Sequence, residues 1–155
     1  MKTQDYLEYV HNLASNSADT DKPFWYLSGP MSGYPQYNFP AFAKAAETLR
    51  GFGYNLVSPA ELDDPEVYAA VINDPQGTSL DSDDHARLLA RDLIIVSMPN
   101  CVGCMVLPGW QVSVGALAET YVADVLGKQI VAFYEDIAGG PVLIPLDRSE
   151  HVELH

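Results

Sequence analysis

Basic side chains are scarce in this chain. Its 155 residues include 8 lysines and arginines against 21 aspartates and glutamates, giving a formal net charge of -13. Such a charge repels a polyphosphate backbone, so it argues against a domain that binds a nucleic acid polymer. A small anionic ligand is still compatible with it, because backbone N–H groups at a helix N-terminus can hold a phosphate without any basic side chain.

Cysteines and long apolar runs are also few. Cys101 and Cys104 are three residues apart in a predicted strand, which is too far for a disulfide, and no other metal-binding side chains cluster near them. We therefore expect two buried thiols and no metal site. No stretch approaches 18 apolar residues, and the first ten residues have no apolar signal segment. These features predict a soluble, cytoplasmic protein without membrane contact.

Strand and helix patterns alternate along the chain. Strands are predicted at 24–27, 54–57, 102–107 and 129–134, with a possible fifth at 142–144. Helices are predicted at 3–14, 40–49, 84–97 and 113–126. Alternation of this kind indicates an α/β fold: a doubly wound, flavodoxin- or Rossmann-like parallel sheet of about five strands in a single domain. Within the chain, residues 1–22 form an N-terminal helix and linker, and residues 23–155 form the main domain.

The segment 58–84 is a long acidic connection between the second and third strands. It contains three prolines and only a short helical patch at 67–72. Long ordered loops tend to be functional, so we expect this one to cross the carboxyl edge of the sheet. Asp83 or Asp84 is expected to cap the helix that follows. The aspartates here lack the glycine and terminal glutamate of a calcium loop, which favours a solvated loop.

The stretch 107–128 organises the rest of the chain. It reads as the end of a strand, a turn at Pro108, and a helix that Ser113 caps and Gly127 ends. An apolar stripe is predicted along this helix, formed by Val114, Leu117, Ala118, Tyr121, Val122 and Val125. Glu119 lies next to that stripe, where burying its carboxylate costs several kcal/mol unless something compensates. A functional role for Glu119 is the natural explanation.

Several polar side chains fall where the predicted strands end or where helices follow them. They are Tyr26, Ser28, Ser32, Asp92, Ser113 and Glu119. Two carboxylates, one nucleophilic and one acidic, are what cleavage with retention at a sugar carbon requires. Simpler interpretations exist: Asp92 as a solvated partner of Arg91, Ser113 as a helix cap only, and Tyr26 as a core tyrosine.

A resemblance to a known family rests on six motifs. They read YLSGPMSG, YNFPAF, LRGFGY, VSPAEL, RDL and LPGWQVSVGALAE. Together they resemble a phage- and bacteria-associated family of small domains related to the nucleoside 2-deoxyribosyltransferases and the deoxynucleoside 5′-monophosphate N-glycosidases. The similarity covers roughly residues 24–133, and the S-x-G-A-x-x-E element is its most specific part.

The resemblance implies roles for individual residues. Glu119 would be the nucleophile that attacks the anomeric carbon, Asp92 would position or protonate the base, and Tyr26 would orient Glu119. The substrate would contact Ser28, Gly29, Ser32, Asn38, Trp110, Ser113 and Gly115, with Ser113 on the 5′-phosphate. Tyr34, Tyr37 and Trp110 would shape the base pocket together with the segment 63–84.

The expected activity is an N-glycosidase acting on a (deoxy)nucleoside 5′-monophosphate, with no cofactor and no metal. Base exchange by a deoxyribosyltransferase is the alternative within the same chemistry. A nucleotide-binding protein without catalysis is the alternative from another class, because Asn100 replaces the aspartate that usually opens the central strand and Pro30 replaces a loop serine.

A homo-oligomer is also expected, with a neighbouring copy completing the active site. Relatives in the resembled family form dimers or larger assemblies. The apolar stripe of the helix 113–126 is wide enough to face both the sheet and a partner, and Tyr6, Tyr9 and Leu13 of the first helix could extend the patch. The net charge opposes association, but salt screens charges more than about 8 Å apart.

Overall fold

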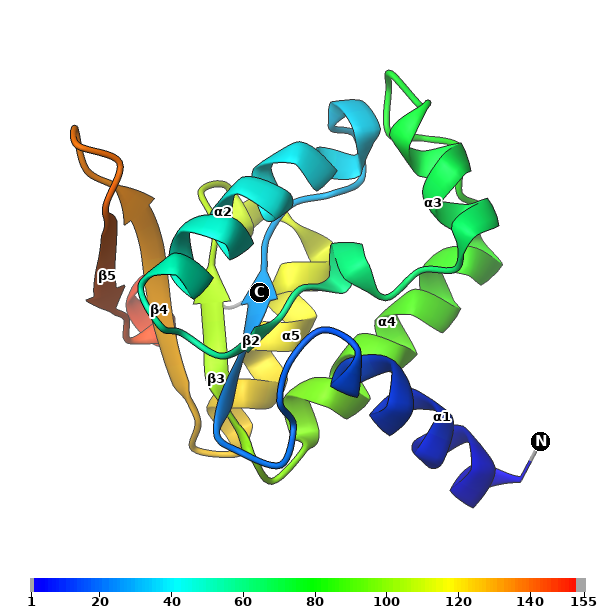
Figure 1. Cartoon of the computed structure of the whole chain (residues 1–155), viewed down its shortest axis with the longest axis horizontal. Helices are drawn as coiled ribbons and strands as arrows, with labels where there is room; N and C mark the ends of the chain where they lie inside the picture. Colours follow the sequence, from blue (N-terminus) through cyan, green and yellow to red (C-terminus); the bar gives the residue numbers. More distant parts are fainter. Residues whose placement is uncertain (1, 153–155) are drawn as a thin grey trace.

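The computed structural model describes residues 2–152, which form an α/β fold with one five-stranded sheet (Figure 1). The strands are β1 (Phe24–Ser28), β2 (Leu56–Val57), β3 (Cys101–Val106), β4 (Gln129–Glu135) and β5 (Pro141–Pro145). The α-helices are α1 (Thr3–Ser15), α2 (Phe39–Gly51), α3 (Pro65–Ile72), α4 (Ser82–Ser97) and α5 (Val114–Val125). The strand order is β2-β1-β3-β4-β5, so the predicted doubly wound fold is confirmed.

Four strands are parallel, and β5 runs antiparallel to β4. The direction of β5 departs from the predicted parallel arrangement because only five residues, 136–140, separate β5 from β4. A parallel connection needs a crossover of a dozen or more residues, whereas a short turn can join antiparallel neighbours. The backbone N–H of Gly140 donates to the Asp136 carboxylate at 2.8 Å and closes that turn.

Strand β2 is shorter than the four residues predicted. Only Leu56 and Val57 pair with β1, opposite Trp25 and Tyr26. The side chain of Asn55 turns away to bond the carbonyls of Asp19 and Pro23 in the linker, at 2.8 and 3.0 Å. The N-terminal linker is thereby attached to the start of the edge strand.

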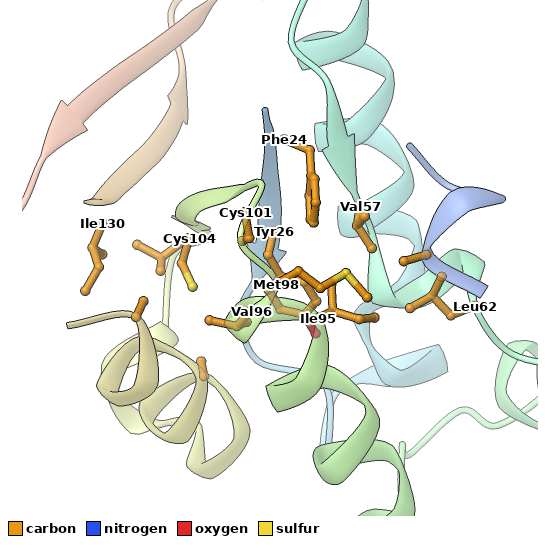
Figure 2. Close-up of a cluster of buried hydrophobic side chains, with 14 of the residues drawn as sticks. Phe24, Tyr26, Val57, Leu62, Ile95, Val96, Met98, Cys101, Cys104 and Ile130 are labelled. Atoms are coloured by element: carbon orange, nitrogen blue, oxygen red, sulfur yellow. The ribbon is translucent and has the colours of Figure 1, made fainter. Parts of the chain in front are cut away.

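Two apolar layers enclose the sheet. One face packs on α2 through a cluster that includes Leu27, Phe42 and Met105. The opposite face carries the larger cluster, in which side chains of β1 and β3 meet α1, α4 and α5. Figure 2 shows Phe24 and Tyr26 of this cluster close to Ile95 of α4. One face of the sheet is therefore covered by α2, and the other face is covered by α1, α4 and α5.

The N-terminal helix belongs to the same core as the main domain. Val10 and Ala14 of α1 are fully buried and pack in the cluster that contains Phe24 and Ile95. In Figure 1, α1 lies against α4, at the end of the molecule opposite β5. Within residues 2–152, none of the helices combines the length and the apolar character that crossing a bilayer requires.

The N-cap of α4 lies two to three residues before the predicted cap. Asp81, not Asp83 or Asp84, is the N-cap: its carboxylate accepts from the N–H of Asp84 at 2.9 Å. The Asp84 carboxylate in turn accepts from the N–H of Asp81 at 3.2 Å. Two acidic side chains at this spacing form a reciprocal capping box, and the first of them marks the helix boundary.

Only part of the predicted apolar stripe of α5 faces the core, where Leu117 and Val122 pack against the large cluster. Ala116, Thr120 and Ala123 face the core together with Glu119, and Val114 and Tyr121 of the stripe are 81% and 59% exposed. Small side chains bring α5 close to the sheet, which places the Glu119 carboxyl against β1. The predicted caps are confirmed, because Ser113 accepts from the N–H of Ala116 and Gly127 adopts a φ of 70° after the last turn.

We predict that Gly103→Ala destabilises the protein strongly. A Cβ at Gly103 would lie 1.8 Å from the backbone oxygen of Gln129, so β3 and β4 could not keep their present separation. The expected loss is about 3 kcal/mol or more in the free energy of unfolding, measured by urea denaturation. Gly51→Ala in α2 is the control, since no atom lies within 4 Å of its added Cβ. It should gain about 0.5–1 kcal/mol, and equal stability of the two variants would contradict the packing of β3 on β4.

Candidate active site

A cleft opens at the carboxyl ends of β1 and β3. These neighbours are where the strand order reverses, because the chain crosses from β1 to β2 on one side and returns to β3 on the other. Doubly wound sheets bind their ligands at such a point. The cleft has a volume of about 480 Å³. Its lining includes six residues that the sequence predicted for the site: Gly29, Ser32, Asp92, Ser113, Gly115 and Glu119.

Glu119 is held by two hydroxyl groups from β1. The Tyr26 hydroxyl donates to Oε2 at 2.8 Å, and the Ser28 hydroxyl donates to Oε1 at 2.6 Å. Tyr26 and Ser28 are two residues apart on a strand, so both side chains point to the face that α5 covers. All three residues are buried. Each carboxylate oxygen is thus fixed by its own donor, and the Ser28 hydroxyl, predicted to bind substrate, is occupied by Glu119.

Asp92 reaches the same point from α4. It is buried, and its Oδ1 accepts a hydrogen bond from Arg91 Nε at 2.9 Å. The interpretation of Asp92 as a partner of Arg91 is therefore right about the pairing and wrong about solvation. Arg91 also donates through Nη1 to Asp63 Oδ1 at 2.8 Å, and both of these side chains are almost completely buried.

The sequence suggested a pairing of Arg91 with Asp92 but did not reveal that Arg91 also binds Asp63. Adjacent residues on a helix normally point in different directions, so the pairing of Arg91 with Asp92 has no signature in the spacing. Asp63 lies in the connection between β2 and α3, and only the folded chain brings it to α4. The RDL motif contained a signal, since a cation directly before a candidate acid needs a partner if both are buried.

Burial and mutual repulsion control ionisation in this group of side chains. Burial raises the pKa of Glu119 well above its ordinary value of 4.5, the charge of Asp92 raises it further, and the hydrogen bonds from Ser28 and Tyr26 oppose both effects. Burial also raises the pKa of Asp92, against the opposing charge of Arg91. Asp92 lies close enough to Glu119 for its charge to raise the Glu119 pKa. Two ionised carboxylates close together repel each other, so burial and repulsion both favour uptake of a proton by the pair.

Tyr26 remains a neutral donor to this pair. Its pKa is raised well above 10.0, first by burial and then by the charges of Asp92 and Glu119. Its ring packs in the core cluster, as the core interpretation predicted, while its hydroxyl holds Glu119. Tyr26 therefore packs in the core through its ring and contacts Glu119 through its hydroxyl.

The loop after β1 forms one wall of the cleft and contains an unusual turn. Gln36, Tyr37 and Asn38 have φ values of 55°, 50° and 61°. A left-handed conformation costs roughly 1–2 kcal/mol for each residue with a side chain, so the surrounding structure must compensate. The Asn38 side chain donates to the Pro30 carbonyl at 2.9 Å and does not line the cleft. In this structure the Asn38 side chain stabilises the loop through that bond.

The long segment 58–84 supplies the compensating contacts. The backbone N–H and the side-chain amide of Gln36 donate to the carbonyls of Asp74 and Ile72, both at 2.7 Å. The N–H of Leu80 donates to the Tyr37 hydroxyl at 2.7 Å. The segment thus lies against the loop after β1, and Val71 and Leu80 add apolar surface to the cleft. Its predicted contribution to the wall of the site agrees with this placement.

Trp110 does not reach the cleft. It is buried in the core cluster behind α5, with its ring centroid 6.4 Å from that of His151. Trp110 directly follows the turn at Gly109, which has a φ of 88°, and it is not among the residues that line the cleft. Tyr34 and Tyr37 do line the cleft, and they remain the aromatic residues available for stacking on a base.

We predict that Glu119→Gln makes the protein more stable at neutral pH. The pKa of Glu119 is higher in the folded than in the unfolded chain, so the folded state binds more protons in the window between those values. Wild-type stability must then fall as the pH rises from about 4.5, by about 1.4 kcal/mol for each pH unit that the two pKa values differ. The amide does not titrate and escapes this loss.

Thermal unfolding followed by circular dichroism between about pH 4.5 and 8.5 measures the effect. The melting temperatures of wild type and Glu119→Gln should diverge as the pH increases. Glu8→Gln, on the exposed side of α1, should follow wild type. Parallel curves for wild type and Glu119→Gln would show that Glu119 titrates normally.

Comparison with known proteins gives one match. No curated protein and no solved structure matches the chain. A family model described as Domain of unknown function (DUF4406) matches residues 24–132, which include β1 to β3 and the residues Tyr26, Asp92 and Glu119. The match covers more than half of the chain and the whole core of the cleft. The protein therefore belongs to the DUF4406 family.

Proposed function

We propose that the protein is an N-glycosidase that cleaves the bond between base and deoxyribose in a (deoxy)nucleoside 5′-monophosphate. The observation that supports this most is the environment of Glu119. Its two oxygens are held by Tyr26 and Ser28 beside a second carboxyl, Asp92, at the wall of a cleft. Two carboxyls that share a proton can supply the nucleophile and the acid of glycosidic cleavage with retention.

In the proposed reaction, Glu119 attacks C1′ while the bond from C1′ to the base nitrogen breaks. Asp92 gives its proton to the departing base, and the sugar is left as an ester on Glu119. Asp92, now ionised, takes a proton from water, whose oxygen attacks C1′ and releases the sugar phosphate. Tyr26 and Ser28 keep Glu119 oriented. Glu119 leaves as a carboxylate and Asp92 is protonated again, so both groups return to their starting states.

The proposed phosphate site is the N-terminus of α5. Ser113 and Gly115 line the cleft there, and the first N–H groups of a 12-residue helix point toward it. Ser113 uses its oxygen as the helix cap, which leaves its hydroxyl hydrogen free to donate to a ligand. A phosphate in this place supports hydrolysis of a nucleotide over base exchange between free nucleosides, whose 5′ position is a hydroxyl.

The alternative of a protein that binds nucleotides without cleavage loses part of its motivation. Asn100 precedes β3 at the amino edge of the sheet, where its side chain donates to the Thr20 carbonyl at 3.0 Å. It lies at the opposite end of the strand from the cleft, so the replacement of aspartate by asparagine does not change the site. Pro30 does line the cleft and remains the one departure near the proposed substrate site.

Both cysteines are buried and unpaired, which supports the proposed cytoplasmic location.

Incubation with a panel of deoxynucleoside 5′-monophosphates tests the activity. We predict that wild type releases a free base, detected by chromatography, and that Glu119→Gln lowers the rate by about 10³-fold or more because the nucleophile is lost. Glu8→Gln is the control and should keep the wild-type rate. Normal turnover by Glu119→Gln would exclude the mechanism. Nucleotide binding without base release, even at high protein concentration, would favour a binding protein.

Addition of a second free base separates hydrolysis from transfer. If the protein is a hydrolase, the second base leaves the products unchanged and the sugar phosphate accumulates. Formation of a new nucleotide carrying the added base would identify a transferase. Both reactions would depend on Glu119 as the nucleophile. The assay therefore shows whether water or the added base accepts the sugar phosphate, and it does not test the role of Glu119.

We also propose that a second copy of the chain covers the exposed apolar face of α5. Val112, Val114, Tyr121, Val125 and Leu126 are between 50% and 83% exposed. Apolar side chains that are contiguous on the surface mark interaction sites. Val112 and Val114 also line the cleft, so a partner on this face would reach its entrance.

Sedimentation velocity at micromolar protein concentration tests the assembly. We predict a species of at least twice the 17.0 kDa chain mass. Val125→Glu places a charge within the exposed apolar face and should dissociate the assembly, whereas Asp83→Asn, on the exposed part of α4, should not. A single species of chain mass that releases base at the wild-type rate would mean that each chain closes its own site.

A further inference from the structure

We propose that Asp63 and Arg91 are positioning residues that decide which carboxyl, Asp92 or Glu119, carries the shared proton in the free protein. In this arrangement Arg91 holds Asp92 as the anion, and Glu119 keeps the proton until substrate enters. The inference deepens the proposed function and takes its catalytic meaning from it. The placement of the proton can nevertheless be measured without any turnover.

The geometry favours Asp92 as the anion. The guanidinium of Arg91 donates Nε to Asp92 at 2.9 Å and Nη1 to Asp63 at 2.8 Å. The three side chains are exposed by only 6% to 11%, so water screens their charges little. Arginine stays ionised in proteins, and its planar fork fixes both partners at once. Asp63 therefore prevents the guanidinium from turning away from Asp92.

Glu119 has no such cation. Its hydrogen-bond donors are the hydroxyls of Tyr26 and Ser28, which are neutral. Asp63, Arg91 and Asp92 already carry a net charge of minus one when both aspartates are ionised. A second uncompensated anion in contact with Asp92 would be costly, so the proton belongs on Glu119.

The other titratable groups near the pair do not offer a second cation. Tyr26 faces it from β1 and Cys104 from β3, and burial raises the pKa of both, so both stay neutral. His85 lies on α4 at the wall of the same cleft and is exposed to solvent. Arg91 is thus the one cation among residues 2–152 that is hydrogen-bonded to either carboxyl of the pair.

The catalytic consequence is a proton transfer before attack. The nucleophile must be ionised and the acid protonated, so the proton passes from Glu119 to Asp92 when the substrate binds. One proton moves between two carboxyls, and the total charge of the site does not change. Because Asp63 belongs to the connection that leads into α3, this segment of the cleft wall is linked directly to the charge state of Asp92.

Two variants should shift the pair in opposite directions. Arg91→Gln removes the positive charge, so loss of the shared proton should occur at a pH higher by about 1–3 units. Asp63→Asn keeps an oxygen for Arg91 Nη1 but removes a negative charge, so the same loss should occur at lower pH. A purely structural ion pair would lower stability in both variants without shifts of opposite sign.

Carboxyl ¹³C NMR of glutamate-labelled protein measures the titration, and the Glu119 signal is identified by its disappearance in Glu119→Gln. Arg87→Gln is the matched control: it removes the same charge one turn earlier on α4, where Arg87 is 75% exposed and paired with Asp84. It should leave the Glu119 titration unchanged. Arg91→Lys should recover part of the shift of Arg91→Gln, because it keeps the charge without the fork.

When the pair holds one proton, the Glu119 carboxyl carbon of wild type should have the chemical shift of a neutral acid, and the shift of an ionised carboxylate would overturn the inference. Opposite shifts in the two variants would support the role of Asp63 and Arg91, and equal or absent shifts would overturn it. If Arg91→Gln does not fold, Asp63→Asn decides alone, since it leaves every hydrogen bond an acceptor and must still lower the titration. In turnover assays the pH optimum should move with the NMR titration. Shifts without base release would refute the N-glycosidase and leave the proton assignment standing, and base release without the shifts would refute the assignment alone.

Discussion

The burial of one carboxyl group constrains the whole central part of this protein. Glu119 can lie against the sheet only because β1 presents two hydroxyls on one face, two residues apart, and each bonds one of its oxygens. The small residues Ala116, Thr120 and Ala123 let α5 approach closely enough for those bonds to form. The residues of β1, the close packing of α5 and the burial of Glu119 therefore depend on one another.

The features of the fold that cost free energy, an unfavourable backbone and buried charges, lie around the same cleft. Its wall contains three consecutive residues in the left-handed conformation, held by backbone groups of the segment 72–80. That segment is anchored further back through Asp63, which bonds Arg91 on α4. A loop with an unfavourable backbone and a helix with buried charges thus support one another. Unfavourable local conformations persist where the surrounding structure holds them in place, and such positions cluster at functional sites. Here they form the wall of the cleft.

Much of this arrangement could be predicted from sequence because it follows from local patterns. Alternating periodicities predicted the strands and helices, and a carboxylate among small apolar residues identified Glu119. The rest depends on contacts between distant segments. Asp63 and Arg91 become a pair only after the segment 58–84 folds over α4, and Trp110 is buried in the core cluster by contacts with distant segments. The apolar stripe of α5 is divided between the core and the surface, because helical spacing identifies apolar positions without saying what covers each of them.

The central claim is that Glu119 becomes covalently bound to a sugar, and a trapped intermediate tests it most directly. A deoxynucleoside monophosphate with fluorine at C2′ slows both steps, because fluorine destabilises the oxocarbenium-like transition states. Intact-protein mass spectrometry should then show one added sugar phosphate, and peptide mapping should place it on Glu119. Glu119→Gln should acquire none. Release of base from the analogue with no adduct, or an adduct on another residue, would contradict the account.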